Sequence, residues 1–573
     1  MPAPIATIEH VVKRFPGSPA PAIADVSFSI RAGEITGLIG SDGAGKTTLL
    51  RLIAGLLRPT SGMISVSGIE TTARTDVLHR VVAYMPQRFG LYEDLSVKEN
   101  LQLYADLRGL APDYRPQTFD RLLTFTDLHR FTARLAGHLS GGMKQKLGLA
   151  CALIAKPTLL LLDEPSVGVD PISRRELWRM VRELLSGGIG VVWSTAYLDE
   201  AERCDSVVLL HEGRILFEGA AAPLTQQLNG RVFALRVPIQ ERRGVAAKLV
   251  RQDGVADAVI QGQHIRVVTN KGYAIGDIAA GLNGSASPLA PRFEDAFVTL
   301  TPARAAPIDD CPLAVRIRSG EGTVVEATAL SKRFGDFVAT DKATFSVRAG
   351  EVFGLLGPNG AGKSTIFRML CGLLKPSSGS ARVNGVDLAQ SATRVRARVG
   401  YMAQKFSLYG DLSVEQNLDF FAGAYGLSGT AKAMARERVM SALGLGHLRR
   451  SQAGLLPLGF RQRLSLAAAT MHDPDVIFLD EPTSGVDPIT RREFWGHINA
   501  MVAKGVTVIV TTHFLEEAEY CDRVALINAG TIIALDTPDG LKRAAASPDM
   551  PEPSLDDAFV ALVERSAQQT QAA

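Results

Sequence analysis

The chain has 573 residues and a formal net charge of +3. A single hydrophobic core is not expected at this length, because cores stop growing at roughly 250 to 300 residues. This charge is too small to indicate nucleic acid or an anionic membrane surface as a partner. The five cysteines are scattered without a C-x-x-C pair, so neither a disulfide framework nor a zinc site is predicted. No stretch approaches the roughly 18 apolar residues of a membrane span, and no apolar signal segment opens the sequence, so we expect a soluble chain.

The first predicted element is an antiparallel edge subdomain of strands and turns over residues 7–30, where apolar and polar residues alternate. Phe15 lies in a KRF segment there, and Phe334 lies in a second KRF segment further along. Either ring could stack on an adenine base, whose π-face tolerates any aromatic partner. Either could equally be a core residue on the face of a strand, and the sequence leaves both interpretations open.

A glycine-rich loop, GSDGAGKTT, follows, and a second one, GPNGAGKST, begins 317 positions later. Each matches G-x-x-x-x-G-K-[ST] between an apolar run and a helix-like segment, which is the context of a phosphate-binding loop. The glycines let backbone N–H groups converge on phosphates, the lysine reaches the outer phosphates, and the following hydroxyl can ligate Mg²⁺. The predicted ATP-binding loops comprise Gly40, Ser41, Asp42, Gly43, Ala44, Gly45, Lys46, Thr47 and Thr48 in the first copy, and Gly357, Pro358, Asn359, Gly360, Ala361, Gly362, Lys363, Ser364 and Thr365 in the second.

The spacing of the two loops recurs elsewhere, for example between Cys204 and Cys521. Such a regular long repeat indicates two copies of one large domain rather than a short-period solenoid. Each copy next carries a glutamine after a predicted strand, Gln87 in YMPQ and Gln404 in YMAQ. A glutamine there is ordinarily a surface residue, but the parallel contexts predict that its amide reaches Mg²⁺ or an attacking water. Mainly helical patterns follow over residues 95–150 and 412–467.

Two continuous apolar runs, of the kind buried in a parallel sheet, each end in a pair of acids. The first acid, Asp163 or Asp480, is placed to hold Mg²⁺. The second, Glu164 or Glu481, is placed to orient or deprotonate the attacking water. The predicted magnesium ligands are Thr47, Ser364, Asp163, Asp480, Gln87 and Gln404.

Between the copies, the pattern predicts a small β-α-β-α accessory domain that ends in FEDAFVTLT. LDDAFVALV repeats this ending near the C-terminus, where no β-α insert is present. A segment rich in proline, alanine and charged residues links the halves. The predicted division is a first ATP-binding domain at 1–227, the accessory domain at 228–302, a linker at 303–322, a second ATP-binding domain at 323–540 and a tail at 541–573.

Together, the two phosphate loops, the glutamines, LSGGMKQK, LDEP, SVGVD and TSGVD resemble a tandem ATP-binding protein of the ABC superfamily. The resemblance covers about four fifths of the chain and implies an α/β fold of two doubly wound ATPase domains with ATP and Mg²⁺ as cofactors. It also implies a head-to-tail pairing, in which each ATP lies between the phosphate loop of one domain and the LSGG signature of the other. Ser140, Gly141 and Gly142 would then contact the γ-phosphate.

In that family, separate membrane permease subunits dock near the glutamine loops, which places the protein at the cytoplasmic face of the inner membrane. No nucleic-acid partner is implied. The FEDAFV and LDDAFV endings resemble the tails of drug-resistance and antibiotic-efflux ATP-binding subunits, so we expect export. The alternatives are a sugar-importer ATPase and a soluble ABC factor acting on ribosomes, and the second would carry a charged helical linker and two intact signatures.

The two copies differ at three functional positions. Where the first has LSGG, the second has a leucine on each side of Pro457, which has no N–H to give to a phosphate. The second copy has His513, a candidate donor to the γ-phosphate, where the first has Ala196. The first loop also has Asp42 in place of Asn359, and the effect of this exchange is open.

Under head-to-tail pairing these defects fall in one composite site. We expect one hydrolytic site built on the second phosphate loop and one site that holds ATP as a clamp. Glu164 is intact in the clamp site, so slow hydrolysis there stays open. The predicted catalytic residues are Glu481, His513, Gln404 and Glu164.

Overall fold

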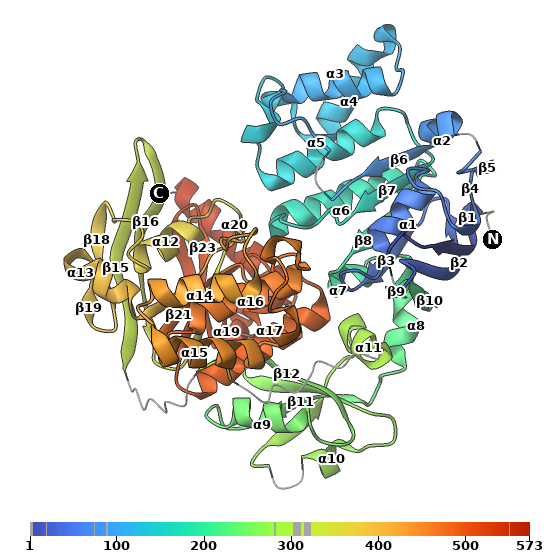
Figure 1. Cartoon of the computed structure of the whole chain (residues 1–573). Coiled ribbons are helices and arrows are strands. Elements are labelled where there is room, and N and C mark those ends of the chain that lie inside the picture. Colours follow the sequence, from blue (N-terminus) through green and yellow to red (C-terminus); the bar gives the residue numbers. More distant parts are fainter. Residues whose placement is uncertain are drawn as a thin grey trace. The chain divides into compact units, whose positions relative to one another are not determined.

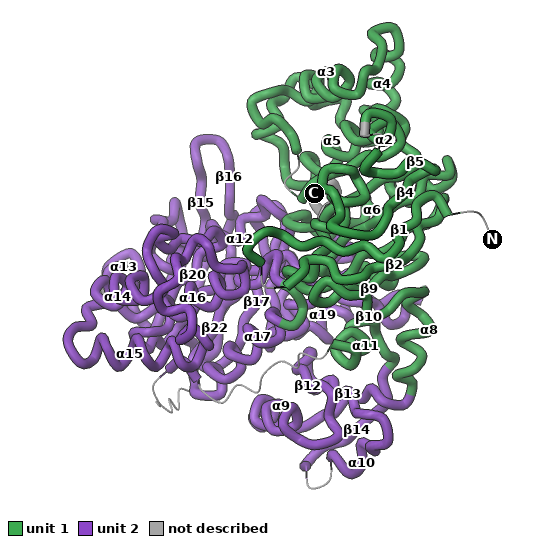
Figure 2. The backbone as a smooth tube through the Cα atoms, turned by 45° about the vertical axis from the view of Figure 1, so that its right-hand side comes forward, with its two compact units in different colours: residues 1–229, 290–304, 487–489 green, residues 230–289, 305–486, 490–573 purple. Residues whose placement is uncertain are grey.

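The computed structural model describes residues 4–18, 20–73, 75–87, 90–279, 282–301, 311–313, 322–548 and 550–572. Of the predicted linker, only residues 311–313 and 322 are among them. The chain forms two compact units, one of residues 1–229, 290–304 and 487–489, and one of residues 230–289, 305–486 and 490–573 (Figure 2).

The core of the first unit is a six-stranded sheet, in which all neighbours are parallel except the edge pair β9 and β10. Its strands, in spatial order, are β10 (Arg214–Gly219), β9 (Ser206–His211), β3 (Ile35–Gly40), β8 (Gly190–Thr195), β7 (Leu159–Asp163) and β6 (Val82–Met85). Every residue of β3, β7 and β8 is buried, which explains their continuous apolar sequences.

A separate antiparallel sheet begins before this core with β1 and β2, where the alternation over residues 7–30 predicts strands, and is completed after β3 and α1. Its spatial order is β2 (Ile23–Arg31), β1 (Pro4–Lys13), β4 (Ser61–Val66) and β5 (Ile69–Glu70). The helices are α1 (Lys46–Ile53), α2 (Thr75–Val81), α3 (Val97–Leu107), α4 (Arg115–Thr126), α5 (Gly141–Leu153), α6 (Pro171–Leu185), α7 (Leu198–Ala201), α8 (Ala221–Gln226) and α11 (Phe293–Leu300). Helices α3, α4 and α5 gather into the predicted helical subdomain (Figure 1).

The second unit repeats this plan with the same strand order. Its antiparallel sheet runs β16 (Phe337–Arg348), β15 (Thr323–Phe334), β18 (Ser378–Val383) and β19 (Val386–Asp387). Its six-stranded sheet runs β20 (Val399–Met402), β21 (Val476–Asp480), β22 (Thr507–Thr512), β17 (Val352–Leu356), β23 (Arg523–Asn528) and β24 (Thr531–Asp536). The helices are α12 (Lys363–Leu370), α13 (Leu388–Arg396), α14 (Val414–Ala424), α15 (Gly429–Ala442), α16 (Leu458–Thr470), α17 (Pro488–Ala503), α18 (Leu515–Ala518), α19 (Pro538–Ala545) and α20 (Leu555–Ala572). The predicted pair of doubly wound α/β domains is confirmed.

The accessory domain is a four-stranded antiparallel sheet with two helices. Its strands, in spatial order, are β12 (Val255–Gln261), β13 (His264–Thr269), β11 (Val232–Arg236) and β14 (Ser285–Pro288), and its helices are α9 (Arg242–Leu249) and α10 (Ile275–Ile278). The β-α-β-α pattern predicted from the sequence lacks β12 and β14. Strand β14 is exposed at every residue, so it carries no apolar alternation that a sequence pattern could detect.

The two DAFV endings each form a helix. Helix α11 packs on α7 and α8 in the first unit, and α20 packs on α18 and α19 in the second. Among the described residues, no helix combines the length and the apolar character that crossing a membrane requires.

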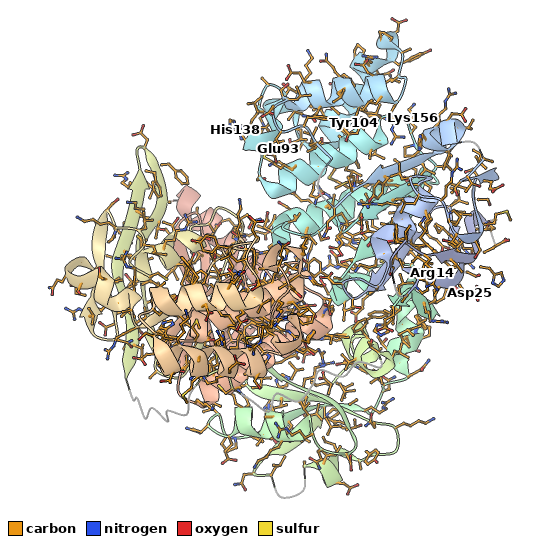
Figure 3. The ribbon with its side chains drawn as sticks, in the orientation of Figure 1. Arg14, Asp25, Glu93, Tyr104, His138 and Lys156 are labelled. Atoms are coloured by element: carbon orange, nitrogen blue, oxygen red, sulfur yellow. The ribbon has the colours of Figure 1, made fainter. Side chains whose placement is uncertain are left out.

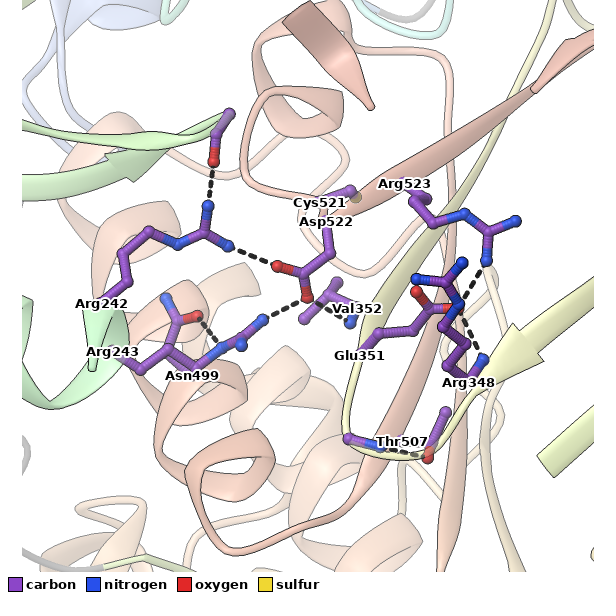
Figure 4. Close-up of polar contacts among 12 residues, drawn as sticks. Arg242, Arg243, Arg348, Glu351, Val352, Asn499, Thr507, Cys521, Asp522 and Arg523 are labelled. Atoms are coloured by element: carbon purple, nitrogen blue, oxygen red, sulfur yellow. Dashed lines mark hydrogen bonds and ion pairs between the residues drawn. The ribbon is translucent and has the colours of Figure 1, made fainter. Parts of the chain in front are cut away.

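Several polar contacts join the accessory domain to the second ATP-binding domain, and the carboxylate of Asp522 takes part in two of the ion pairs (Figure 4). It accepts hydrogen bonds from Arg242 and Arg243 of the accessory domain and, at 2.8 Å, from the backbone N of Val352. The Arg242 side chain is only 2% exposed, and burial lowers its pKa although Asp522 opposes the effect. Close by, the backbone N of Gly262 donates to the carbonyl O of Glu519 at 2.7 Å.

We expect Asp522→Ala to destabilise the second unit by about 2 kcal/mol more than Asp205→Ala destabilises the first, because it leaves two arginines unpaired in a buried site. Asp205 is the matched control. It accepts from the backbone N of Ile35 at 2.8 Å, as Asp522 does from Val352, but its arginine, Arg182, is 41% exposed. Urea unfolding, with proteolysis of the accessory domain as a second readout, measures the difference. Equal losses in the free energy of unfolding would show that the ion pairs of Arg242 and Arg243 add nothing to the stability of the second unit.

Candidate functional site

The first phosphate loop joins β3 to α1 and holds its lysine inside. Lys46 Nζ donates to the carbonyl O of Gly40 at 2.8 Å and of Ser41 at 3.1 Å, and lies 3.4 Å from Oε1 of Glu164. Gly45 has φ +105, and a Cβ there would lie 2.5 Å from the carbonyl O of Ala22, so only glycine fits. The loop therefore places a buried ammonium at the start of α1, where a phosphate would replace carbonyl oxygens as its acceptor.

The predicted magnesium ligands and catalytic acid of the first copy converge beside this lysine. Thr47 Oγ1 donates to Asp163 Oδ1 at 3.1 Å, and Gln87 Nε2 donates to Glu164 Oε2 at 2.8 Å. A hydroxyl, a carboxylate and an amide oxygen are the hard oxygen ligands that Mg²⁺ prefers, so these residues fit the ion. Burial raises the pKa of Glu164, and the charge of Lys46 offsets this only in part.

The second copy reproduces this arrangement. Lys363 Nζ donates to the carbonyl O of Gly357 at 2.6 Å and of Pro358 at 3.0 Å. Ser364 Oγ donates to Asp480 Oδ1 at 3.3 Å, and Gln404 Nε2 donates to Glu481 Oε2 at 2.9 Å. In both copies the side chains that the sequence assigns to phosphate, Mg²⁺ and water activation meet at the carboxyl ends of the parallel strands.

His513 makes the second site different. Its Nδ1 lies 3.0 Å from Oε2 of Glu481 and its side chain is 1% exposed, and among the described residues neither ring nitrogen has a hydrogen-bond partner. Only an imidazolium can donate from both ring nitrogens, so the protonated form could hold Glu481 with one and a phosphate oxygen with the other. In the first copy, Ala196 offers neither donor.

The pKa values of the two glutamates diverge as a result. Burial by itself would raise the pKa of Glu481, but the adjacent imidazole of His513, with the charge of Lys363, outweighs it and lowers the pKa. Glu164 has no such partner, and its pKa is raised. The second glutamate is thus the better ionised acceptor for a proton from water.

The two signature segments also differ in structure. In the first copy, Ser140 caps α5 by accepting a hydrogen bond from the backbone N of Met143 at 3.3 Å. In the second, Pro457 precedes α16 and makes no side-chain cap. Gly142 lies in the first turn of α5, where a Cβ would lie 2.5 Å from the side chain of Ser173, so the helix approaches α6 closely there. Gly141, which has no side chain, corresponds to Leu458 in the second copy.

The remaining predicted residues are exposed. Phe15 is 39% and Phe334 50% exposed, and a lysine ammonium lies 5.2 Å from the centre of each ring. Neither is therefore a core residue on a strand face, and adenine stacking is the prediction that stays. Asp42 and Asn359 occupy the same exposed point of their loops.

Two residues near the carboxylates were not identified from the sequence. Tyr84 donates to Asp163 Oδ2 at 2.9 Å, and burial, with the charge of Asp163, raises the pKa of Tyr84 to about 12. Thr511 donates to Asp480 Oδ1 at 2.5 Å and accepts from the backbone N of Glu481 at 2.9 Å. The usable signal for Tyr84 was the YM dipeptide that both copies place before the glutamine.

Comparison with known proteins shows the family of the chain. Residues 23–167 and 340–484 each match the family model described as ABC transporter. The probable multidrug ABC transporter ATP-binding protein YbhF of Escherichia coli (strain K12) is 54% identical over 566 residues, covering 98% of each chain. The daunorubicin resistance ATP-binding protein DrrA2 of Streptomyces coeruleorubidus is 41% identical over 39% of this chain and 69% of its own length. A structure of archaeal ribosomal stalk protein aP1 with archaeal ribosome recycling factor aABCE1 aligns over 98% of each chain with a TM-score of 0.58 and 19% identity, a likeness of fold alone.

Proposed function

The chain belongs to the ABC transporter family and is a tandem ATPase, and from this premise we propose that it energises export of a drug-like or lipid-like substrate through separate permease subunits. The similarity to a probable multidrug transporter subunit over the whole chain and to a daunorubicin resistance protein over part of it supports export. The permeases would dock around the loops of Gln87 and Gln404 and hold the protein at the cytoplasmic face of the inner membrane.

The two sites would divide the work. In the proposed head-to-tail pairing, the second phosphate loop with Glu481 and His513 faces the intact signature of Ser140 to Gly142 and hydrolyses ATP. The first loop, with Ala196 nearby, faces Pro457 and holds ATP as a clamp. The observation that carries this proposal is the contact of His513 with Glu481, 3.0 Å, which has no counterpart in the first copy.

The residues of the second site suggest how hydrolysis proceeds. Lys363 turns from the loop carbonyls to the outer phosphates, and Phe334 stacks on the adenine. Glu481 accepts a proton from the attacking water while Gln404 fixes the carboxylate. His513 donates from Nε2 to the γ-phosphate as charge develops on it. Ser364, Asp480 and Gln404 would hold Mg²⁺, and the bound ion would neutralise negative charge on the phosphates.

ATP binding would close the paired domains, and hydrolysis would reopen them to drive transport. The first site would lack two hydrogen-bond donors to the γ-phosphate, one at Ala196 and one at Pro457. Losing one preorganised donor costs roughly 100 to 1,000-fold in rate, so the loss of two is compatible with a site that binds ATP without hydrolysing it. Glu164 keeps its contacts to Gln87 and Lys46, so residual turnover at the clamp is compatible with the proposal.

Mild detergent extraction tests the transporter assignment against the ribosomal alternative. We expect the tagged full chain to co-purify with polytopic membrane proteins. On a sucrose gradient, we expect it to be absent from the fractions that contain ribosomes. Gln404→Ala and Gln87→Ala should preserve folding while changing coupling of ATP turnover to transport. Stable co-sedimentation with ribosomes, without membrane partners, would overturn the assignment.

A further inference from the structure

The first ATP-binding domain contains a pocket of about 380 Å³ that its ATP site does not explain. It lies between α4 and the ends of α5 and α6, and its wall includes Arg121, Leu122, Phe125, Leu153, Lys156 and Ile189. Figure 3 labels Lys156, which follows the end of α5. The pocket borders the start of β7, whose other end carries Asp163 of the ATP site, and five residues of strand span roughly 17 Å.

The second copy holds a peptide at the corresponding place. Residues 311–313 of the linker lie there, and Leu313 is 4% exposed. Arg438 Nε donates to the carbonyl O of Pro312 at 3.1 Å, and Lys504 Nζ donates to that of Leu313 at 3.4 Å. By the repeat spacing, Arg438 corresponds to Arg121 and Lys504 to Gly187, which also lines the first pocket. The second domain therefore binds a Pro-Leu segment of its own chain at this position, and Pro312 and Leu313 form a bend there.

The first pocket differs from the second in charge. In the second copy, Asp473 Oδ1 lies 3.0 Å from Arg438 and neutralises it. Its counterpart in the first copy is Lys156. Within the part of the chain that the structure describes, the side chains of Arg121 and Lys156 have no hydrogen bond or ion pair. The first pocket thus combines an apolar wall with two cations that lack an acidic partner.

We propose that this pocket binds an acidic Pro-Leu segment of a partner protein, as the second domain binds its own linker. Arg121 donates to a backbone carbonyl of the segment, the leucine side chain fills the space beside Phe125, and Lys156 pairs with an acidic residue. A proline there limits the conformational entropy lost on binding. The chain's own segment at 311–313 is already engaged in the second copy, so the occupant comes from outside.

The probe is a fluorescein-labelled peptide with the sequence of residues 309–315, DDCPLAV, carrying Cys311→Ser. Anisotropy titration of the full chain should show binding, weakened at least about tenfold, or 1.4 kcal/mol, by Arg121→Glu. Gly187→Trp, which fills the pocket from a position where a Cβ meets only ordinary contact, should weaken it as much. The matched variant Arg438→Glu should leave peptide binding unchanged. Unchanged ATP turnover should show that all three variants are folded.

Five results would overturn the proposal. No binding at about 1 mM peptide, or equal binding by Arg121→Glu, would remove the pocket as a peptide site. Loss on Arg438→Glu alone would place the peptide in the second domain. Binding that survives replacement of both aspartates by lysine would remove the role of Lys156. Self-association of the chain that Arg121→Glu abolishes would make the occupant a second copy rather than a partner.

Discussion

Glu481→Gln is expected to abolish ATP turnover by the full chain, by about 1,000-fold or more, whereas Glu164→Gln should leave most of it. A positioned general base contributes roughly 100 to 10,000-fold, and only Glu481 has the lowered pKa that keeps such a base ionised. Both variants keep their lysine and their magnesium ligands, so ATP binding should survive in each. Steady-state phosphate release, with nucleotide binding measured separately, gives the comparison.

The pair of glutamine variants also tests the division of work between the sites. Retained turnover in Glu164→Gln would leave the first phosphate loop as a clamp. Equal loss in both variants would mean that the sites are coupled or equally hydrolytic, and the reading of Ala196 and Pro457 as disabling would be wrong. That outcome would leave the family membership untouched, because the sequence similarity does not depend on it.

His513→Ala is expected to lower turnover by roughly 100 to 1,000-fold, the effect of removing one preorganised donor to a developing charge. The variant also has a pH signature. Glu481 must be ionised to accept a proton, and His513 is what pulls its pKa down against burial. Without the histidine, the pKa of Glu481 rises as that of Glu164 does, so the acid limb of the rate profile moves to higher pH.

The first copy supplies the control for this experiment. Ala196→His places a histidine at the matching strand end, beside Glu164. If proximity of the imidazole lowers the carboxyl pKa, the exchange should lower that of Glu164, followed by NMR of the carboxyl group. A loss of turnover in His513→Ala with an unmoved acid limb would assign His513 to phosphate contact alone and would contradict its effect on Glu481.

The local parts of this protein could be predicted from its sequence. The phosphate loops, the paired acids and the glutamines belong to short contiguous motifs whose residue types and spacing indicate their chemistry. The structure brings these motifs together. Strand β14 escaped prediction because it is short and fully exposed. Thr511 escaped because its role depends on β22 lying beside β21, a neighbour that no local pattern reveals.

The contacts that fix the accessory domain were also beyond sequence patterns. Arg242 and Asp522 are 280 positions apart, and neither belongs to a motif. The same holds for the docking of Pro312 on Arg438, 126 positions away. In each case a buried surface, rather than a periodicity, selects the partner.

The long separation of Arg242 from Asp522 has a consequence for biosynthesis. The accessory domain leaves the ribosome well before its carboxylate partner, which lies 280 positions later. At 5 to 20 residues per second, the delay is roughly 15 to 55 s. Throughout it, Arg242 and Arg243 stay hydrated, and the face of α9 that will be covered remains open. Docking of the accessory domain on the second ATP-binding domain through these arginines therefore waits until Asp522 has been made.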